Sequence, residues 1–182
     1  MITLKFIIGI ILLIWILFIA YLYVLSIINS MIYRVPQVAS FNSDLRVMRK
    51  WLKKYNLAWK KLIDMWSWTG KMLRFFEKEF ACITTWYEID LANSIIARIL
   101  NKVFKTNCEV IRWNYFTSNL ANFDIIYIYL YPELVAKIEE KIEKEARKGT
   151  IVIANAFKLI KAEPIEIIYD DKWKEEVYIY EV

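Results

Sequence analysis

Three polar side chains follow three short apolar stretches of the chain. Asp64 lies at the end of residues 61–65, Glu88 at the end of residues 81–89, and Asn114 just after residues 108–112. If these stretches are parallel strands, their carboxyl ends meet at one edge of a sheet, where α/β proteins bind ligands. Glu88 follows Asp64 by 24 positions, close to the spacing at which a carboxylate accepts hydrogen bonds from both hydroxyls of a ribose. The spacing predicts a nucleoside-binding crevice, with a helix cap as the alternative for Asp64 and a plain surface acid for Glu88.

The composition excludes several kinds of catalytic site. The chain has no histidine, which excludes histidine-based triads, histidine acid–base catalysis and histidine-containing zinc sites. Its two cysteines, Cys82 and Cys108, are far apart and each lies in an apolar run, so we expect no metal site and no disulfide framework. The formal net charge of +5 does not by itself indicate a nucleic acid as partner.

Strands and helices alternate after residue 33, which predicts an α/β fold with a mostly parallel sheet and helices on both faces. The predicted strands are residues 61–65, 81–89, 108–112, 123–130 and 151–154, and a closing antiparallel hairpin is predicted from residues 165–169 and 175–181. The predicted helices are residues 40–57, 71–80, 91–105 and 132–147, the last with Gly149 as its C-cap.

Helical spacing places apolar side chains along one side of two of these helices. In residues 40–57 the apolar side is Leu45, Val47, Met48, Trp51 and Leu52, and in residues 91–105 it is Leu91, Ile95, Ile96, Ile99, Leu100 and Val103.

The N-terminal segment is long and apolar enough to cross a membrane. Residues 6–28 carry no charge and form roughly 34 Å of helix at 1.5 Å per residue, against a hydrocarbon core of about 30 Å. A cleaved signal peptide is the alternative, but its apolar core is shorter and small residues follow it. We therefore expect an anchor in residues 1–32 and one domain in residues 33–182. Basic residues from Arg34 to Lys54 predict a cytoplasmic domain and a single-pass protein of the cell membrane. The same basic stretch either rests on anionic headgroups or is a solvated helix face.

With these loops and the anchor in view, the sequence resembles a class I S-adenosylmethionine-dependent methyltransferase, a Rossmann-like fold whose first loop reads D-x-G-x-G-x-G. More narrowly, it resembles the membrane-anchored protein-lysine methyltransferases that modify the ATP synthase c subunit and the adenine nucleotide translocase. The segments that carry this likeness are residues 33–36 (YRVP), 64–71, 86–90, 129–134 (YLYPEL), 148–157 and 177–180. They span nearly all of residues 33–182, and their order and spacing are more specific than any one of them.

The resemblance implies S-adenosyl-L-methionine as cofactor and assigns roles to residues. Cofactor contacts are implied for Asp64, Trp66, Ser67, Trp68, Gly70, Glu88, Ile89, Asn114 and Tyr115. Asp64 would order the first loop and the amino end of the ligand, Glu88 would hold the ribose, and Asn114 would lie beside the adenine. Tyr87, Ile89, Tyr115 and Phe116 would sandwich the adenine, with a core position as the alternative. Tyr131 and Pro132 would line the acceptor entrance, with simple helix initiation as the alternative.

Tryptophan stands where the family has glycine. Trp66 and Trp68 lie in the first loop, and Trp59, Trp86 and Trp113 lie at other turn or strand positions where relatives use glycine. We hypothesise that these codons are UGA read as glycine in the natural protein, because UGA and GGA differ by one base. The chain has 3 glycines and 8 tryptophans, and the sum of 11 is near the roughly 13 glycines expected for its length. The alternative is that the tryptophans are genuine and the site is dead or remodelled.

The leading interpretation is a membrane-anchored protein-lysine methyltransferase whose substrate lies in or near the same membrane, with no nucleic acid expected as partner. Methylation of RNA or a small molecule on the same fold is the second interpretation. Against it, the stretch after residues 123–130 reads Tyr129-Leu130-Tyr131-Pro132 instead of the Asn/Asp-Pro-Pro-Tyr/Phe motif of amide or base-nitrogen methylation. A catalytically dead, membrane-tethered binding module is the third, and it holds if the tryptophans are genuine.

Overall fold

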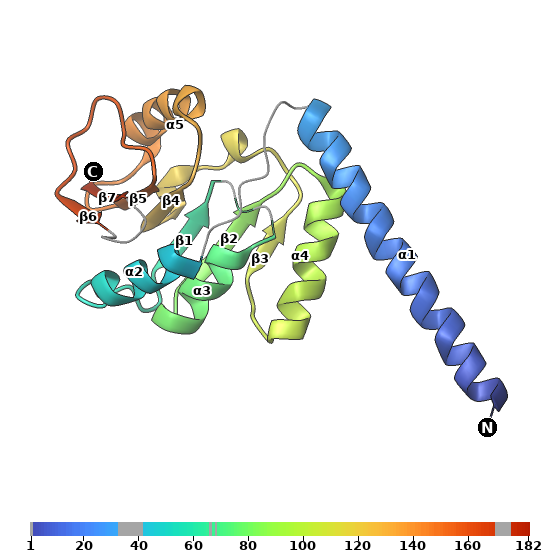
Figure 1. Ribbon diagram of the computed structural model, residues 1–182. Coiled ribbons are helices and arrows are strands. Elements are labelled where there is room, and N and C mark those ends of the chain that lie inside the picture. Colours follow the sequence, from blue (N-terminus) through green and yellow to red (C-terminus); the bar gives the residue numbers. More distant parts are fainter. Residues whose placement is uncertain (1, 33–41, 66, 68, 170–175) are drawn as a thin grey trace.

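The computed structural model describes residues 2–32, 42–65, 67, 69–169 and 176–182. These residues form a seven-stranded sheet in the order β3-β2-β1-β4-β5-β7-β6, with helices packed on both of its faces (Figure 1). The predicted fold class is confirmed: a Rossmann-like, mostly parallel sheet with a C-terminal antiparallel hairpin, preceded by one long apolar helix.

The central strand β1 (Lys61–Asp64) pairs in parallel with β2 (Ile83–Tyr87) on one side and β4 (Ile125–Ile128) on the other. Beyond β2 lies β3 (Glu109–Ile111), and beyond β4 lies β5 (Ile151–Asn155). The hairpin places β7 (Glu176–Glu181) antiparallel to β5, with β6 (Glu166–Tyr169) at the edge. Strand β4 is buried along its whole length, as its continuous apolar composition requires in a sheet covered on both faces.

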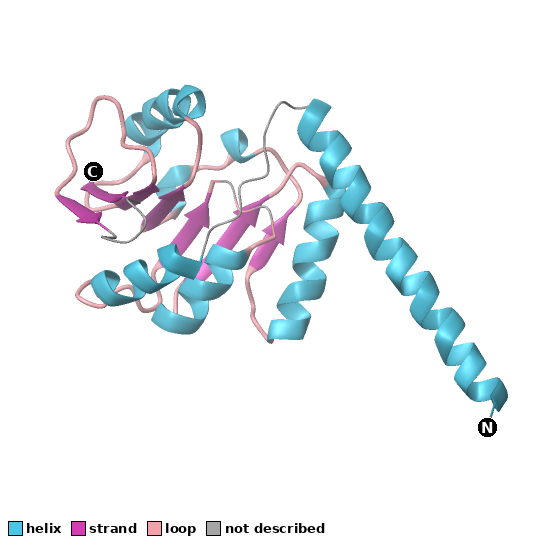
Figure 2. Cartoon of the chain, viewed as in Figure 1, coloured by secondary structure: helices cyan, strands magenta, loops and turns pink. Residues whose placement is uncertain are grey.

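Each face of the sheet has its own core. On one face α2 (Asn42–Leu52), α3 (Lys71–Phe80) and α4 (Leu91–Phe104) cover the strands, and on the other α5 (Pro132–Glu145) does so (Figure 2). Neighbouring residues of β1 separate accordingly, because Leu62 joins the core with Phe76 of α3 while Ile63 joins the core with Ile138 of α5. The period of two along a strand therefore divides the apolar residues between two layers.

Helix and strand boundaries differ from the sequence prediction in several places. Helix α3 is confirmed at residues 71–80, whereas α2 ends at Leu52, five residues early, and Trp51 on its apolar side is exposed. Helix α5 ends at Glu145, and its C-cap is Ala146 instead of Gly149. Gly149 instead has φ +83° in the turn before β5, where its N–H bonds to the carbonyl of Val182 at 2.7 Å.

Helix α4 buries mainly small and polar side chains. Its buried side chains are Ala92, Asn93, Ser94, Ala97 and Asn101. The apolar stripe is exposed at Leu91 and Val103 and half-buried at the four residues between them. The small side chain of Ala97 allows close packing on the sheet, and Asn101 contributes a hydrogen bond from Nδ2 to the carbonyl of Cys108 at 2.9 Å. The bulky aliphatic side chains are left on the outer side of the helix.

Helix α1 (Ile2–Ile32) contains a segment, Leu4–Ile28, that is long and apolar enough to cross a membrane by length and composition. Residues 4–21 are exposed throughout. Near its C-terminal end α1 contacts α4, where Leu22 and Ser26 are buried and Ser26 Oγ donates a hydrogen bond to Asn93 Oδ1 at 2.6 Å.

Candidate functional site

The loops that carry the predicted site follow β1, β2, β3 and β4 at the same edge of the sheet. The register aligns Asp64, the last residue of β1, with Trp86 of β2 and Tyr127 of β4. Chain order reverses at β1, because the next strands in the sequence lie to one side of it and β4 to the other. A crevice at such a reversal is the usual ligand site of an open parallel sheet, so the topology brings the predicted loops together.

The first loop turns at a glycine in the left-handed region. Gly70 has φ +75° at the N-cap of α3, and its N–H bonds to the carbonyl of Ser67 at 2.8 Å. A Cβ at this position would lie 3.0 Å from Arg74 Nη1 and 3.4 Å from the ring of Trp86. Glycine is therefore favoured chiefly by its φ, and the Arg74 guanidinium would have to shift to accommodate a Cβ. Ser67 Oγ is buried and has no hydrogen-bond partner among the described residues.

Arg74 supports this loop, and the sequence analysis did not identify it. The side chain is buried at 8% exposure, and Nη1 donates to the carbonyl of Thr69 at 2.7 Å and to Asn101 Oδ1 at 3.3 Å. Burial lowers the pKa of Arg74 from its ordinary value. An arginine four residues after Gly70, on the side of α3 that packs inward, was the only signal in the sequence. Its contacts tie the first loop to α4.

Glu88 follows β2 and is largely enclosed. Its Oε1 accepts a hydrogen bond from the Asp90 N–H at 2.8 Å, and its own N–H donates to the Ile111 carbonyl at 2.9 Å. Burial raises the pKa of Glu88 to about 8, and the nearby carboxylates of Asp90 and Asp64 act in the same direction. Asp64 itself is fully buried at the end of β1. The two acids that the sequence placed at neighbouring strand ends therefore interact electrostatically.

Asp90 has a structural role that links the site to α1. Its Oδ1 accepts from the Asn93 N–H at 2.8 Å, which caps α4. The Asn93 side chain in turn accepts the hydrogen bond from Ser26 of α1. The loop that carries Glu88 is thus connected through the first turn of α4 to the long apolar helix. Sequence spacing did not indicate this chain of contacts.

The third loop places Asn114 at the surface. Its Oδ1 accepts from the Phe116 N–H at 3.0 Å, and its carbonyl accepts from Thr117, so the residue starts the short 3-10 helix Tyr115–Thr117. This local role is compatible with a ligand contact through the amide group. Ile89 is exposed at 47% at the same edge of the sheet.

The fourth loop leads into α5. Tyr131 occupies the N-cap with an extended backbone, and Pro132 is the first helical residue, so helix initiation is one role that both residues have. The Tyr131 ring is partly exposed and lies 6.0 Å from the ring of Phe157, which follows β5. Two aromatic rings from the segments that follow the adjacent strands β4 and β5 therefore meet at this edge of the sheet.

Three tryptophans at the expected glycine positions lie within the described residues. Trp59 has φ +63°, an outlier for a bulky residue, and its side chain is 77% exposed. Trp86 is 1% exposed, and its Nε1–H is buried with no hydrogen-bond partner among the described residues. Trp113 is 63% exposed at the end of β3. Trp66 and Trp68 lie outside the described residues. The strain at Trp59 and the unpaired donor of Trp86 are both relieved by glycine.

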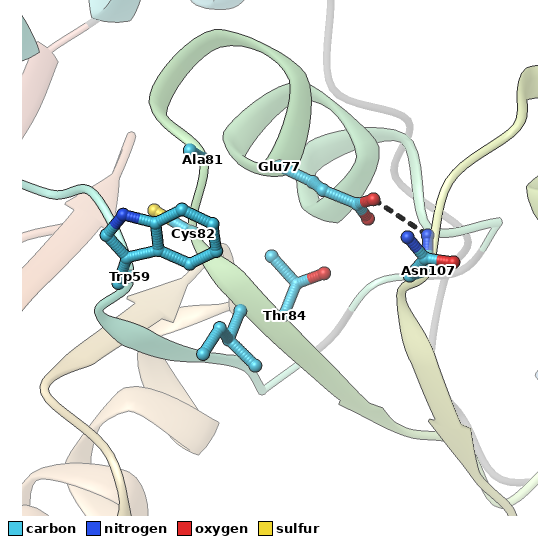
Figure 3. Close-up of a pocket in the computed structure, with 7 residues that line it drawn as sticks. Trp59, Glu77, Ala81, Cys82, Thr84 and Asn107 are labelled. Carbon is cyan, nitrogen blue, oxygen red and sulfur yellow. Dashed lines mark hydrogen bonds between the residues drawn. The ribbon is translucent and has the colours of Figure 1, made fainter.

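A separate hollow of about 300 Å³ opens at the opposite edge of the sheet, where the strands begin. Figure 3 shows Trp59 and Cys82 on one side of it, and Glu77 bonded to the Asn107 N–H at 2.7 Å on the other. It is remote from the carboxyl ends of the strands and contains none of the predicted site residues.

Comparison with solved structures identifies the fold. No family model and no curated protein sequence matches the chain. An RNA methyltransferase from Salinibacter ruber, crystallised with S-adenosyl-L-homocysteine, matches with a TM-score of 0.72 at 18% identity, over 80% of this chain and 94% of that one. The chain has the fold of class I methyltransferases. The B. subtilis tRNA methyltransferase TrmK matches with a TM-score of 0.58 at 13% identity, over 80% of this chain and 68% of TrmK. A variant of MtNAS crystallised with S-adenosylmethionine matches with a TM-score of 0.61 at 9% identity, over 75% of this chain and 60% of that one.

The residues at this edge fit such a cofactor. The Ser67 hydroxyl is a buried group without a partner among the described residues, beside a glycine turn that a Cβ would fill. Glu88 presents a carboxyl group that accepts hydrogen bonds from the backbone of Asp90 and Ile89, and because each carboxylate oxygen has two lone pairs it can still accept from a ribose hydroxyl.

Proposed function

We propose that the protein is a membrane-anchored, S-adenosylmethionine-dependent methyltransferase that methylates lysine side chains of a protein in or near the same membrane. The observation that carries the nucleotide part is the pairing of the Gly70 turn with the enclosed Glu88 carboxyl at neighbouring strand ends. The Gly70 turn lets the ligand approach the backbone closely, and the Glu88 carboxyl is suited to ribose hydroxyls.

The residues of this chain act by binding and alignment. When bound, the cofactor supplies an activated methyl group on a sulfonium sulfur. Glu88 holds the ribose, and the loop around Ser67 and Gly70 holds the methionine part at the start of α3. Tyr131 and Pro132 line the path by which the acceptor nitrogen approaches in line with the methyl group. A lysine acceptor reacts as the neutral amine, which a partly dry entrance favours.

The proposal includes glycine, in place of tryptophan, at five positions of the natural protein. In the natural protein, positions 59, 66, 68, 86 and 113 are glycines encoded by UGA. The left-handed φ of Trp59 and the unpaired indole N–H of Trp86 support this reading. Glycines in the first loop leave the backbone accessible to the cofactor.

The anchor part rests on α1. Residues 1–32 hold the domain of residues 33–182 at the membrane, and the basic residues that follow the span orient the domain toward the cytoplasm. Tethering raises the effective concentration of acceptors in the same membrane.

RNA is the second candidate acceptor, because two proteins of similar structure are RNA or tRNA methyltransferases. The protein acceptor is preferred because the sequence after β4 is Tyr129-Leu130-Tyr131-Pro132, which lacks the side-chain amide or carboxylate that orients a base nitrogen.

Calorimetry with S-adenosylhomocysteine tests the cofactor site. The full chain is prepared in detergent both as written and with the five tryptophans replaced by glycine. Binding by the glycine form alone supports the proposal, and absence of binding by both forms refutes it in favour of a dead binding module. Mass spectrometry of the native protein across residues 62–71 tests the recoding directly, since indole masses there would exclude it.

The acceptor is tested by transfer of radiolabelled methyl groups to membrane protein and to total RNA from the same cells. Label on lysine after protein hydrolysis supports the lysine proposal. Label on RNA alone would establish the second candidate.

A further inference from the structure

Helix α4 exposes an apolar stripe that begins where α1 packs against it. Ala92, Ile96, Ile99 and Val103 have the spacing of one helix face, which we call the outer stripe. Ala92, next to the contact between Ser26 and Asn93, is 3% exposed. Ile96 and Ile99 are half-buried, and Val103 is 66% exposed. The stripe is therefore covered at one end and open at the other.

The path of α1 explains this gradient. Figure 1 shows α1 meeting α4 near the N-terminal end of α4 and then diverging from it toward the N-terminus of the chain, on the side where the strands begin. Within α1, the buried positions Leu22 and Ser26 are four residues apart, which is one helix face. Residues 4–21 remain exposed and span about 27 Å at 1.5 Å per residue, which is most of a hydrocarbon core of about 30 Å.

Basic side chains surround the open end of the stripe. Lys102 and Lys105 are exposed on either side of Val103 and Phe104, and Lys78 Nζ lies 5.4 Å from the centre of the Phe104 ring. Phe104 is itself 47% exposed. The three lysines form no ion pair with another residue that the structure describes. Glu77, which precedes Lys78 in α3, instead accepts hydrogen bonds from the Asn107 N–H and from Cys108 Sγ.

We propose that the open end of α4, formed by Val103, Phe104, Lys78, Lys102 and Lys105, docks on the anionic surface of the bilayer that α1 spans. The inference rests on the proposed anchor. Apolar side chains then enter the space beside α1 where it leaves the domain, and the lysines meet lipid phosphates, each worth about 1 kcal/mol near an anionic leaflet. The sheet edge that carries Glu88 lies at the other end of α4, about 15 Å farther from the lipid by the ten residues from Asn93 to Val103.

This docking explains an otherwise unfavourable pattern of burial. In a free soluble domain the aliphatic side of α4 would face inward and its polar side outward. The chain instead buries Ser94 and Asn101 and leaves the aliphatic side half-buried at Ile96 and Ile99 and exposed at Val103. Lipid against the outer side of α4 makes it favourable to expose the aliphatic side chains and to bury the polar ones. Docking also fixes the orientation of the site above the membrane.

A lipid-quenching experiment tests the proposal on the full chain. Val103→Cys is labelled with an environment-sensitive fluorophore in vesicles containing phosphatidylglycerol and a lipid-borne quencher. Burial raises the pKa of Cys82 to about 12 and, with Glu77, that of Cys108 to about 11, so both native thiols are nearly unreactive at neutral pH. The matched control is Ile160→Cys, with an almost equal exposure of 64%. The backbone N–H of Ile160 donates a hydrogen bond to Glu139 of α5, on the other face of the sheet.

The expected result is quenching at position 103 and none at position 160. Substituting Lys102→Glu and Lys105→Glu should lower the ratio of docked to undocked molecules about five-fold or more for each lysine lost. A third label at Leu12→Cys reports the anchor itself. Quenching at position 12 without quenching at 103 overturns the docking proposal and leaves the anchor intact, whereas no quenching at 12 overturns the anchor. A response of the label at 103 to RNA and not to vesicles would also overturn the docking proposal.

Discussion

Glu88 should make cofactor binding depend on pH in a way that can be calculated from its pKa. If only the ionised carboxylate holds the ribose, the apparent affinity is the intrinsic affinity multiplied by the ionised fraction. With a pKa of about 8, that fraction is about 1% at pH 6, about 9% at pH 7 and about 90% at pH 9. The affinity for S-adenosylhomocysteine should therefore rise about ten-fold from pH 7 to pH 9 and about ninety-fold from pH 6 to pH 9.

Calorimetry on the binding-competent form measures this dependence. Glu88→Gln should bind weakly and with a much flatter pH profile, because the amide does not ionise. Glu109→Gln is the matched control: Glu109 is an exposed acid at the start of β3, on the opposite sheet edge, and its loss should leave the profile unchanged. The ligand amine also titrates, so the comparison is between variants at each pH. A wild-type profile that coincides with that of Glu88→Gln would refute the assignment of Glu88 to the ribose.

Three further outcomes follow from the described contacts. The ligand-free protein should lose stability as the pH rises from about 4.5 to about 8, because the folded state retains the Glu88 proton that the unfolded chain releases, and thermal unfolding of Glu88→Gln should lack this component. Trp59→Gly should raise the unfolding free energy by about 1 kcal/mol, because glycine adopts the left-handed φ of this residue without strain. Trp59→Ala keeps a Cβ and should not raise the unfolding free energy, so equal effects of the two substitutions would argue against strain at this position. Arg74→Met should weaken S-adenosylhomocysteine binding, because the hydrogen bond that holds the Thr69 carbonyl in the first loop is lost. The pH dependence due to Glu88 should remain, and an unchanged affinity would show that the loop does not need the Arg74 hydrogen bond.

Much of the fold was predictable because it depends on local patterns. Alternating apolar strands and amphipathic helices determined the parallel sheet, and the span of uncharged residues in α1 was evident from composition alone. Element ends were less predictable. Helix α5 stops at Ala146 instead of Gly149, because the glycine is needed for the turn whose N–H bonds to Val182.

The sequence by itself determined which residues lie at the strand ends, since Asp64 and Glu88 follow apolar runs that only a sheet can bury. It did not reveal that Arg74 supports the first loop, because that contact joins residues of α3 and α4 brought together only by folding. The burial of α4 was also decided by tertiary structure. Helical periodicity distinguishes an apolar side from a polar side, but not which of them meets the sheet; the small side chain of Ala97, which packs closely, and Asn101, which satisfies a buried carbonyl, determined that choice.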